Sequence, residues 1–124
     1  MACSMVQTLH MVIVPVRFPS CVEVLRVLHL DALGALVGMT EHTDGLPGRV
    51  AVPIRQIVVD ALACEAMTLV LSHNHPGGNP KPSRADIAAT NALVRTVAPL
   101  GIRVHDYIVT GAGCDFSFRA AGLL

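Results

Sequence analysis

Residues 68–98 read TLVLSHNHPGGNPKPSRADIAATNALVRTVA, and this stretch decides the fold. The run at 68–72 is short and apolar, which is typical of a buried strand. Residues 73–82 contain three prolines and two glycines, so they predict a loop rather than a helix or a strand. A helix is then expected at 83–98, where a proline and a glycine follow it and end it. The stretch therefore predicts a strand, a long loop and a helix in direct succession.

The segments on either side predict more strands and one more helix. Branched apolar residues fill VEVLRVLHL and IRVHDYIVT, and apolar residues recur at helical spacing in the segment that begins at Ile54. Since strands and helices interleave around one core, we expect an α/β or α+β fold with a single mixed sheet flanked by helices. The expected elements are strands at 22–30, 35–40, 102–110 and 116–118, a turn at 31–34, a helix at 54–67 and a loop at 42–48.

The chain length of 124 residues corresponds to one domain. We place this domain at residues 21–124 and treat residues 1–20 as an N-terminal segment of uncertain structure. The run at 11–16 has strand character, but Pro15 interrupts it, so its assignment stays open.

The composition excludes several classes of protein. Hydrophobic residues make up 52% of the chain and charged residues 15%, with a formal net charge of zero, which excludes a disordered chain. One lysine and 3% aromatic residues give no basic stripe and no stacking platform, so nucleic-acid binding through this domain alone is not expected. No apolar run approaches the roughly 20 residues of a spanning helix, and no membrane association is predicted. The four cysteines form no CxxC pair, which favours reduced thiols and a cytoplasmic location.

The candidate chemistry lies in the stretch HNHPGGNPKPSRAD. His73 and His75 are two positions apart at the end of a predicted strand, so both imidazoles emerge on the same face. Asp86 lies in the first turn of the next helix, and the intervening loop is long enough to fold it back towards them. Two histidines and one carboxylate are a typical ligand set for catalytic zinc, with water in the fourth position.

Each part of this pattern also has a purely structural interpretation. Ser83 and Asp86 have the spacing of a capping box at the start of a helix. A His-x-His pair taken alone is more often a pair of surface or core histidines than a metal site. Other zinc hydrolases and serine hydrolases fit less well, because the chain has no HExxH, PCxxC or GxSxG motif.

The spacing His-x-His, seven residues, Ser, two residues, Asp resembles the motif of the JAMM (MPN+) metalloproteases. The full string HNHPGGNPKPSRAD is similar to the RadC family of bacterial proteins, as are VEVLRVLHLD, GRVAVPIRQIVVDAL, GIRVHDYIV and SFRAAGLL. The resemblance covers about residues 23–124. It implies a JAB/MPN domain, a fold similar to that of cytidine deaminases.

Carried over to this sequence, the resemblance implies that His73, His75 and Asp86 bind zinc. Ser83 would stabilise the oxyanion, and Glu23 would act as the general base. A carboxylate at the start of an otherwise apolar strand is unusual, which agrees with a chemical role for Glu23.

Other polar residues are weaker candidates. Glu41 and Glu65 are rivals to Glu23, but we expect the first in a loop and the second on the helix at 54–67. His105 and Asp106 are adjacent on a strand and face opposite sides, and either one could support a metal ligand indirectly. Tyr107 occupies a position that the RadC family often fills with a histidine.

The function that follows is that of a zinc metallopeptidase that hydrolyses peptide or isopeptide bonds in a peptide or protein substrate. The alternative is a non-catalytic binding module or scaffold associated with DNA repair, since RadC proteins carry a repair label. Longer family members usually place a helix-hairpin-helix segment, which this sequence lacks, before the domain. The sequence indicates neither the natural substrate nor an oligomeric state.

Overall fold

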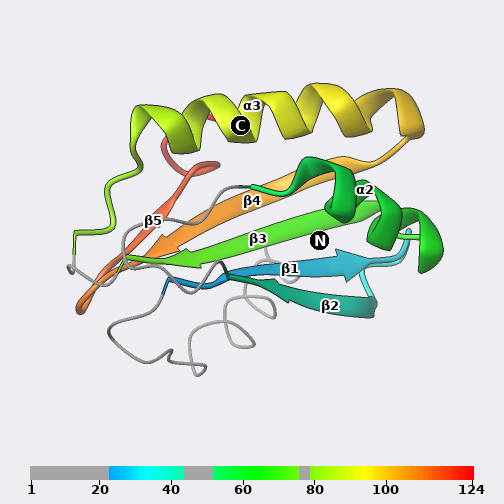
Figure 1. Cartoon of the computed structure of the whole chain (residues 1–124), viewed down its shortest axis with the longest axis horizontal. Coiled ribbons are helices and arrows are strands. Elements are labelled where there is room, and N and C mark those ends of the chain that lie inside the picture. Colours follow the sequence, from blue (N-terminus) through cyan, green and yellow to red (C-terminus); the bar gives the residue numbers. More distant parts are fainter. Residues whose placement is uncertain (1–22, 44–51, 76–78) are drawn as a thin grey trace.

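The computed structural model describes residues 23–43, 52–75 and 79–124. A five-stranded mixed sheet with the strand order β2-β1-β3-β4-β5 lies at its centre (Figure 1). This sheet, together with the two α-helices of the described residues, confirms the predicted fold class. The elements are strands β1 (Leu25–Leu30), β2 (Leu36–His42), β3 (Thr68–Asn74), β4 (Arg103–Thr110) and β5 (Asp115–Ser117), helices α2 (Ile54–Ala63) and α3 (Arg84–Val97), and the short 3-10 helix η1 (Ala98–Leu100).

Within the part of the chain that the structure describes, the sheet has three antiparallel strand pairs and one parallel pair. β1 and β2 form an antiparallel hairpin, and β1 also pairs antiparallel with β3. The pair β3 and β4 is parallel, which requires a long crossover, and α3 supplies it. The short β5 returns antiparallel to β4 and closes that edge of the sheet.

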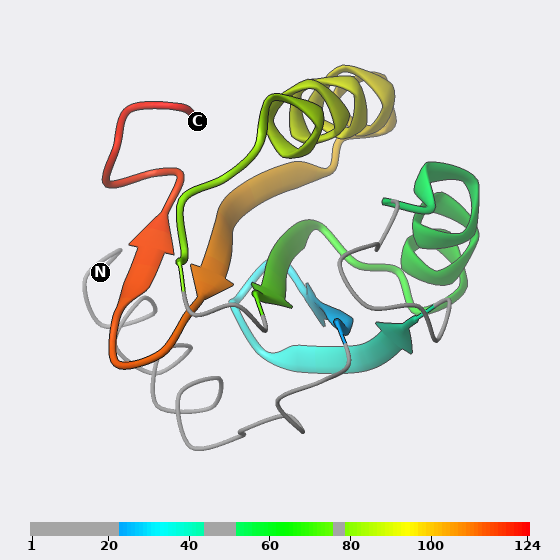
Figure 2. The same cartoon turned by 60° about the vertical axis from the view of Figure 1, so that its left-hand side comes forward.

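Both helices lie on the same face of the sheet (Figure 2). The alternation of side chains along β3 explains the two hydrophobic clusters, because Leu69 and Leu71 point towards the helices and Val70 points away. On the helix side they meet Ile57 of α2 and Leu93 of α3 in the main core. The main hydrophobic core therefore lies between the sheet and the two helices, and it extends to the end of β3.

Helix α2 ends at Ala63, four residues before the end predicted from the apolar spacing. Glu65 has a φ of 57°, and the N–H of Ala66 donates to the carbonyl of Ala61 at 2.9 Å. This left-handed residue and its bond form a helix-ending motif in which glycine is the usual residue. The sequence has glutamate at this position, so no glycine marks the end of the helix in the sequence. The prediction that Glu65 lies on the helix is wrong.

Several strand boundaries differ from the predicted ones by one to three residues. β3 continues through His73 and Asn74, which were expected in the loop, because β4 pairs with both of them. β2 continues to His42, so the prediction that Glu41 lies in a loop is wrong. The turn at 31–34 and the strand that follows it are confirmed. β1 begins at Leu25 rather than at the expected residue 22, and β5 begins and ends one residue earlier than expected.

The strand considered at 11–16 and most of the loop at 42–48 lie outside the described residues. Within the described ranges, no helix combines the length and the apolar character that crossing a bilayer requires.

Candidate metal centre

The candidate centre lies where the end of β3 meets the start of β1. These strands are antiparallel, and Leu25 is opposite His73. Residues just before β1 therefore lie beside the residues that close β3. This register brings Glu23 next to the histidine pair although 50 residues separate it from His73 in the sequence.

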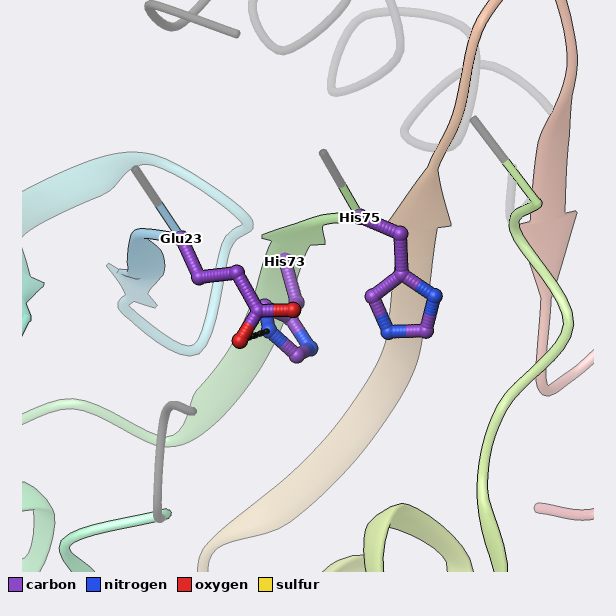
Figure 3. Close-up of side chains that lie close together, drawn as sticks. All are labelled: Glu23, His73 and His75. Carbon is purple, nitrogen blue, oxygen red and sulfur yellow. Dashed lines mark ion pairs between the residues drawn. The ribbon is translucent and has the colours of Figure 1, made fainter. Parts of the chain in front are cut away.

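Glu23, His73 and His75 form a compact group of potential ligands (Figure 3). One ligand atom from each residue lies within 4.8 Å of the other two. Oε2 of Glu23 is 3.7 Å from Nε2 of His73. The two imidazole rings meet edge to face, with centroids 4.9 Å apart. Both histidines are thus on one face, as predicted from their spacing.

Glu23 and His73 are buried, with 6% and 2% exposed, and His75 is partly buried. Burial, with a smaller contribution from neighbouring His75, lowers the pKa of His73 to about 4, while the Asp86 carboxylate acts in the opposite direction. The imidazole of His73 is therefore neutral at pH 7, as a metal ligand must be. Its Nε2 has no hydrogen-bond partner within the described part of the chain. A buried nitrogen of this kind suits a metal ion.

Asp86 reaches the same place from the start of α3. Its Oδ2 lies 3.6 Å from Nε2 of His75. The same Oδ2 accepts the backbone N–H of Ser83 at 2.9 Å, and the Ser83 hydroxyl oxygen accepts the N–H of Asp86 at 3.0 Å. The capping box is therefore complete. A carboxylate oxygen has two acceptor sites, so capping the helix leaves Asp86 able to bind a cation as well.

The spacing of these atoms is compatible with zinc. Two ligand atoms that are each about 2.0–2.1 Å from one tetrahedral zinc ion are about 3.4 Å apart. The pair His75–Asp86, at 3.6 Å, and the pair His73–Glu23, at 3.7 Å, are both close to that value. Each of these pairs therefore has the spacing of two ligands of one small cation. The group whose ligand atoms all lie within 4.8 Å of one another is Glu23, His73 and His75, and Asp86 lies beside that group through its contact with His75.

The other ring nitrogen of each histidine has a defined partner. Nδ1 of His75 is 2.8 Å from the carbonyl oxygen of Asn79. A carbonyl only accepts, so Nδ1 of His75 carries a hydrogen, and Nε2 is the nitrogen that can bind a metal. Nδ1 of His73 is 3.1 Å from the hydroxyl oxygen of Tyr107.

Two residues beside the centre were not assigned a role there from the sequence. Tyr107 on β4 is 1% exposed, and burial, followed by the nearby carboxylates of Asp86 and Glu23, raises its pKa above the usual range. Asn74 accepts the backbone N–H of Val24, the residue next to Glu23, at 2.6 Å. The available signals were the tyrosine at a position that the resemblance associates with histidine and the asparagine enclosed by the His-x-His pair.

The rivals of Glu23 lie elsewhere. Glu41 on β2 forms an ion pair with Arg26 of β1. Glu65 precedes β3, at the opposite end of that strand from His73. Of the three glutamates, Glu23 is the one that the structure brings to the histidines.

Within the described residues, neither His105 nor Asp106 has a hydrogen bond to Glu23, His73, His75 or Asp86. Asp106 accepts the N–H of Tyr107, the hydroxyl of Ser117 and the N–H of Arg119, so it holds the corner between β4 and β5. His105 is the extra residue at a bulge in the β3–β4 pairing, and burial lowers its pKa.

Comparison with known proteins identifies relatives over nearly all of this fold. Residues 4–123 match the family model described as the RadC-like JAB domain. A UPF0758 protein of Rhodobacter capsulatus is 44% identical over 102 residues, which is 82% of this chain and 48% of that protein.

Two further UPF0758 proteins, from Ruegeria pomeroyi and Pasteurella multocida, are each 37% identical over 102 residues. Those 102 residues are 82% of this chain and 46% of each relative. The chain thus spans about half the length of the curated relatives it matches.

Proposed function

Because this chain belongs to the RadC-like JAB domain family, we propose that it is a zinc-dependent hydrolase of peptide or isopeptide bonds. The observation that carries the proposal is the convergence of Glu23, His73 and His75, with ligand atoms within 4.8 Å of one another. Asp86 adds a second carboxylate 3.6 Å from His75. Two imidazoles and two carboxylates gathered at one place, with Glu23 and His73 buried and the other two partly buried, suit metal-assisted hydrolysis better than a purely structural role.

His73, His75 and Asp86 would hold the zinc ion, in the arrangement expected from the sequence. Bound zinc would supply a Lewis acid that lowers the pKa of a water molecule and polarises the carbonyl of the scissile bond. His73 lies on β3, Asp86 lies in the first turn of α3, and His75 follows β3 directly. The backbone N–H of His75 donates to the carbonyl of Thr110 on β4 at 2.8 Å, so all three ligands are attached to regular structure, which favours a defined coordination geometry.

Glu23 would act as the general base. Its carboxylate lies beside the histidines, where it can take a proton from the attacking water and deliver it to the leaving nitrogen. Glu23 lies just before β1 and is not one of the three proposed zinc ligands. It can therefore act as a base while His73, His75 and Asp86 hold the zinc ion.

Ser83 would stabilise the oxyanion of the tetrahedral intermediate. Its oxygen accepts the Asp86 N–H in the capping box, and its hydroxyl hydrogen is the part that can be donated to a substrate. Capping and catalysis therefore use different parts of the same hydroxyl.

The experiment that tests this proposal is elemental analysis of protein purified without chelator, beside the His75→Ala variant. We expect about one zinc per chain in the wild type and a loss of zinc in the variant. His42→Ala is the matched control, because His42 lies on β2 and bonds to Thr40 rather than to the centre. It should keep its zinc.

A panel of peptide and isopeptide substrates then tests turnover by the zinc-loaded protein. Cleavage that Glu23→Gln abolishes would support the hydrolase. Wild-type protein that neither contains zinc nor takes it up on addition would contradict it. In that case Ser83 and Asp86 are a helix cap, and the binding module or scaffold becomes the better account.

A further inference from the structure

Tyr107 occupies a position that the proposed chemistry leaves without a role. It lies on β4 opposite Leu71 of β3, so its side chain is on the helix-covered face, as is that of His73 two residues further along β3. Its ring packs against Phe118, with centroids 4.8 Å apart. This packing fixes the direction of the phenol, and the hydroxyl oxygen ends 3.1 Å from Nδ1 of His73.

The two ring nitrogens of His73 have unequal surroundings. Nδ1 has the Tyr107 oxygen within hydrogen-bond distance. Nε2 is buried without a hydrogen bond in the described residues, and the Glu23 oxygen at 3.7 Å is too far to accept one. A hydrogen on Nδ1 is therefore satisfied, whereas a hydrogen on Nε2 would be a buried donor without an acceptor, which is costly.

His75 provides a parallel case in the same centre. The Asn79 carbonyl at 2.8 Å from Nδ1 can only accept, so Nε2 of His75, which lies 3.6 Å from Asp86, is the nitrogen that can bind a metal. A metal ion bound by Nε2 of both histidines, the nitrogen that lies near a carboxylate in each, would need the same tautomer in both. The Tyr107 hydroxyl is the group placed to give His73 that tautomer.

We propose that Tyr107 is a positioning residue, whose hydroxyl oxygen accepts the Nδ1 hydrogen of His73 and so turns the lone pair of Nε2 towards Glu23 and His75. The inference rests on the proposed metal centre, because it assigns the second nitrogen of one of its ligands. Partners of this kind orient the ring and raise the basicity of the ligand, and their loss typically weakens metal binding about 10–100-fold.

Tyr107→Phe is the variant that tests the proposal, because it keeps the ring that packs on Phe118 and removes only the hydroxyl. Two-bond ¹H–¹⁵N spectra of the imidazoles in the zinc-free protein report which nitrogen carries the hydrogen. We expect His73 to be protonated on Nδ1 in the wild type and to shift towards Nε2 in the variant. Zinc affinity, measured by chelator competition, should fall about 10–100-fold.

Ser117→Ala is the matched control. It also removes one hydroxyl, on the neighbouring strand β5, where Ser117 donates to Asp106 at 2.6 Å rather than to a histidine. The His73 spectrum and the zinc affinity should both equal those of the wild type.

The proposal is overturned if His73 in the wild type carries its hydrogen on Nε2. It is also overturned if Tyr107→Phe leaves either the tautomer or the zinc affinity unchanged. Should the variant fail to fold, the wild-type spectrum alone still decides. Wild-type protein that binds no zinc would refute the proposed function, and the tautomer comparison would remain a separate result.

Discussion

The side-chain oxygen of Asn74 accepts the backbone N–H of Val24 at 2.6 Å, across 50 positions of sequence. Asn74 stands between the two histidines of the candidate centre, and Val24 follows the proposed base, Glu23. This bond therefore attaches the backbone that carries the base to the strand that carries the ligands. The relative position of base and ligands therefore depends on this amide side chain as well as on the pairing of β1 with β3.

Replacing Asn74 with leucine should reduce turnover more than it reduces zinc binding. Leucine has a similar shape but cannot accept the Val24 N–H, so the segment that holds Glu23 loses its attachment. The buried N–H left without a partner should also lower the free energy of unfolding by about 1–3 kcal/mol. Urea denaturation and zinc competition, measured on the same preparation as kcat, separate these effects.

Gln56→Leu is the control for this prediction, because it removes an exposed amide that donates to Asp60 on α2. It should change the free energy of unfolding by less than about 0.5 kcal/mol. If Asn74→Leu were equally mild, the bond to Val24 would not be holding the base.

The two carboxylates of the centre should respond differently to neutralisation. Glu23→Gln should keep its zinc and lose about 10²–10⁴-fold in kcat, because it removes only a general base. Asp86→Asn should instead lose zinc, because it removes the charge of a proposed ligand, while the side-chain oxygen of asparagine can still accept the Ser83 N–H. Elemental analysis and kcat are measured on each variant.

If Glu23→Gln lost its zinc and Asp86→Asn kept it, the third zinc ligand would be Glu23 rather than Asp86. Glu23 already stands in one group with both histidines, so the structure makes this a real alternative. Asp115→Asn, at an exposed position on β5, is the control for neutralising a carboxylate and should alter neither quantity.

The fold was largely predictable from the sequence because its signals are local. The alternation and the apolar runs predict the strands, and Ser83 with Asp86 marks the start of α3 by a capping box that the structure contains. The end of α2 was missed because Glu65 takes a left-handed conformation without the glycine that would announce it.

The candidate site was predictable only where its residues are close in sequence or carried by the resemblance. His73, His75 and Asp86 share one motif, and their side chains do approach one another. The sequence did not predict that Tyr107 lies near His73. The bulge at His105 shifts the pairing of β3 with β4, and this shift decides which β4 side chains lie on the same face of the sheet as His73. Such a contact depends on strand register, which a single sequence does not state.

The zinc-free protein should lose stability as the pH falls from about 6.5 to about 4. The pKa of His73 is lowered to about 4 by burial, while the unfolded chain has the ordinary value near 6.5. Over this range the unfolded state binds the proton and the folded state does not, so protonation favours unfolding. The loss is complete below the folded pKa and amounts to about 3 kcal/mol at most for this one group.

Urea denaturation with chelator present, repeated between pH 7.5 and pH 4.5, measures this loss. His73→Gln should show a shallower decline, since it removes one of the groups responsible. His29 and His105 also have pKa values lowered by burial, so the variant keeps part of the slope. Parallel curves for wild type and variant would show that His73 is not protonated on unfolding in this range.

Substitutions of Ser83 can separate its two proposed roles. Ser83→Ala removes the oxygen that accepts the Asp86 N–H, so it should cost about 1 kcal/mol of stability through the lost cap. It also removes the hydroxyl hydrogen proposed for the oxyanion and should lower kcat about 100-fold or more. Ser83→Asn restores a good capping oxygen but no hydroxyl. It should therefore recover the stability and not the turnover, and a variant that recovered both would leave Ser83 with the cap as its whole role.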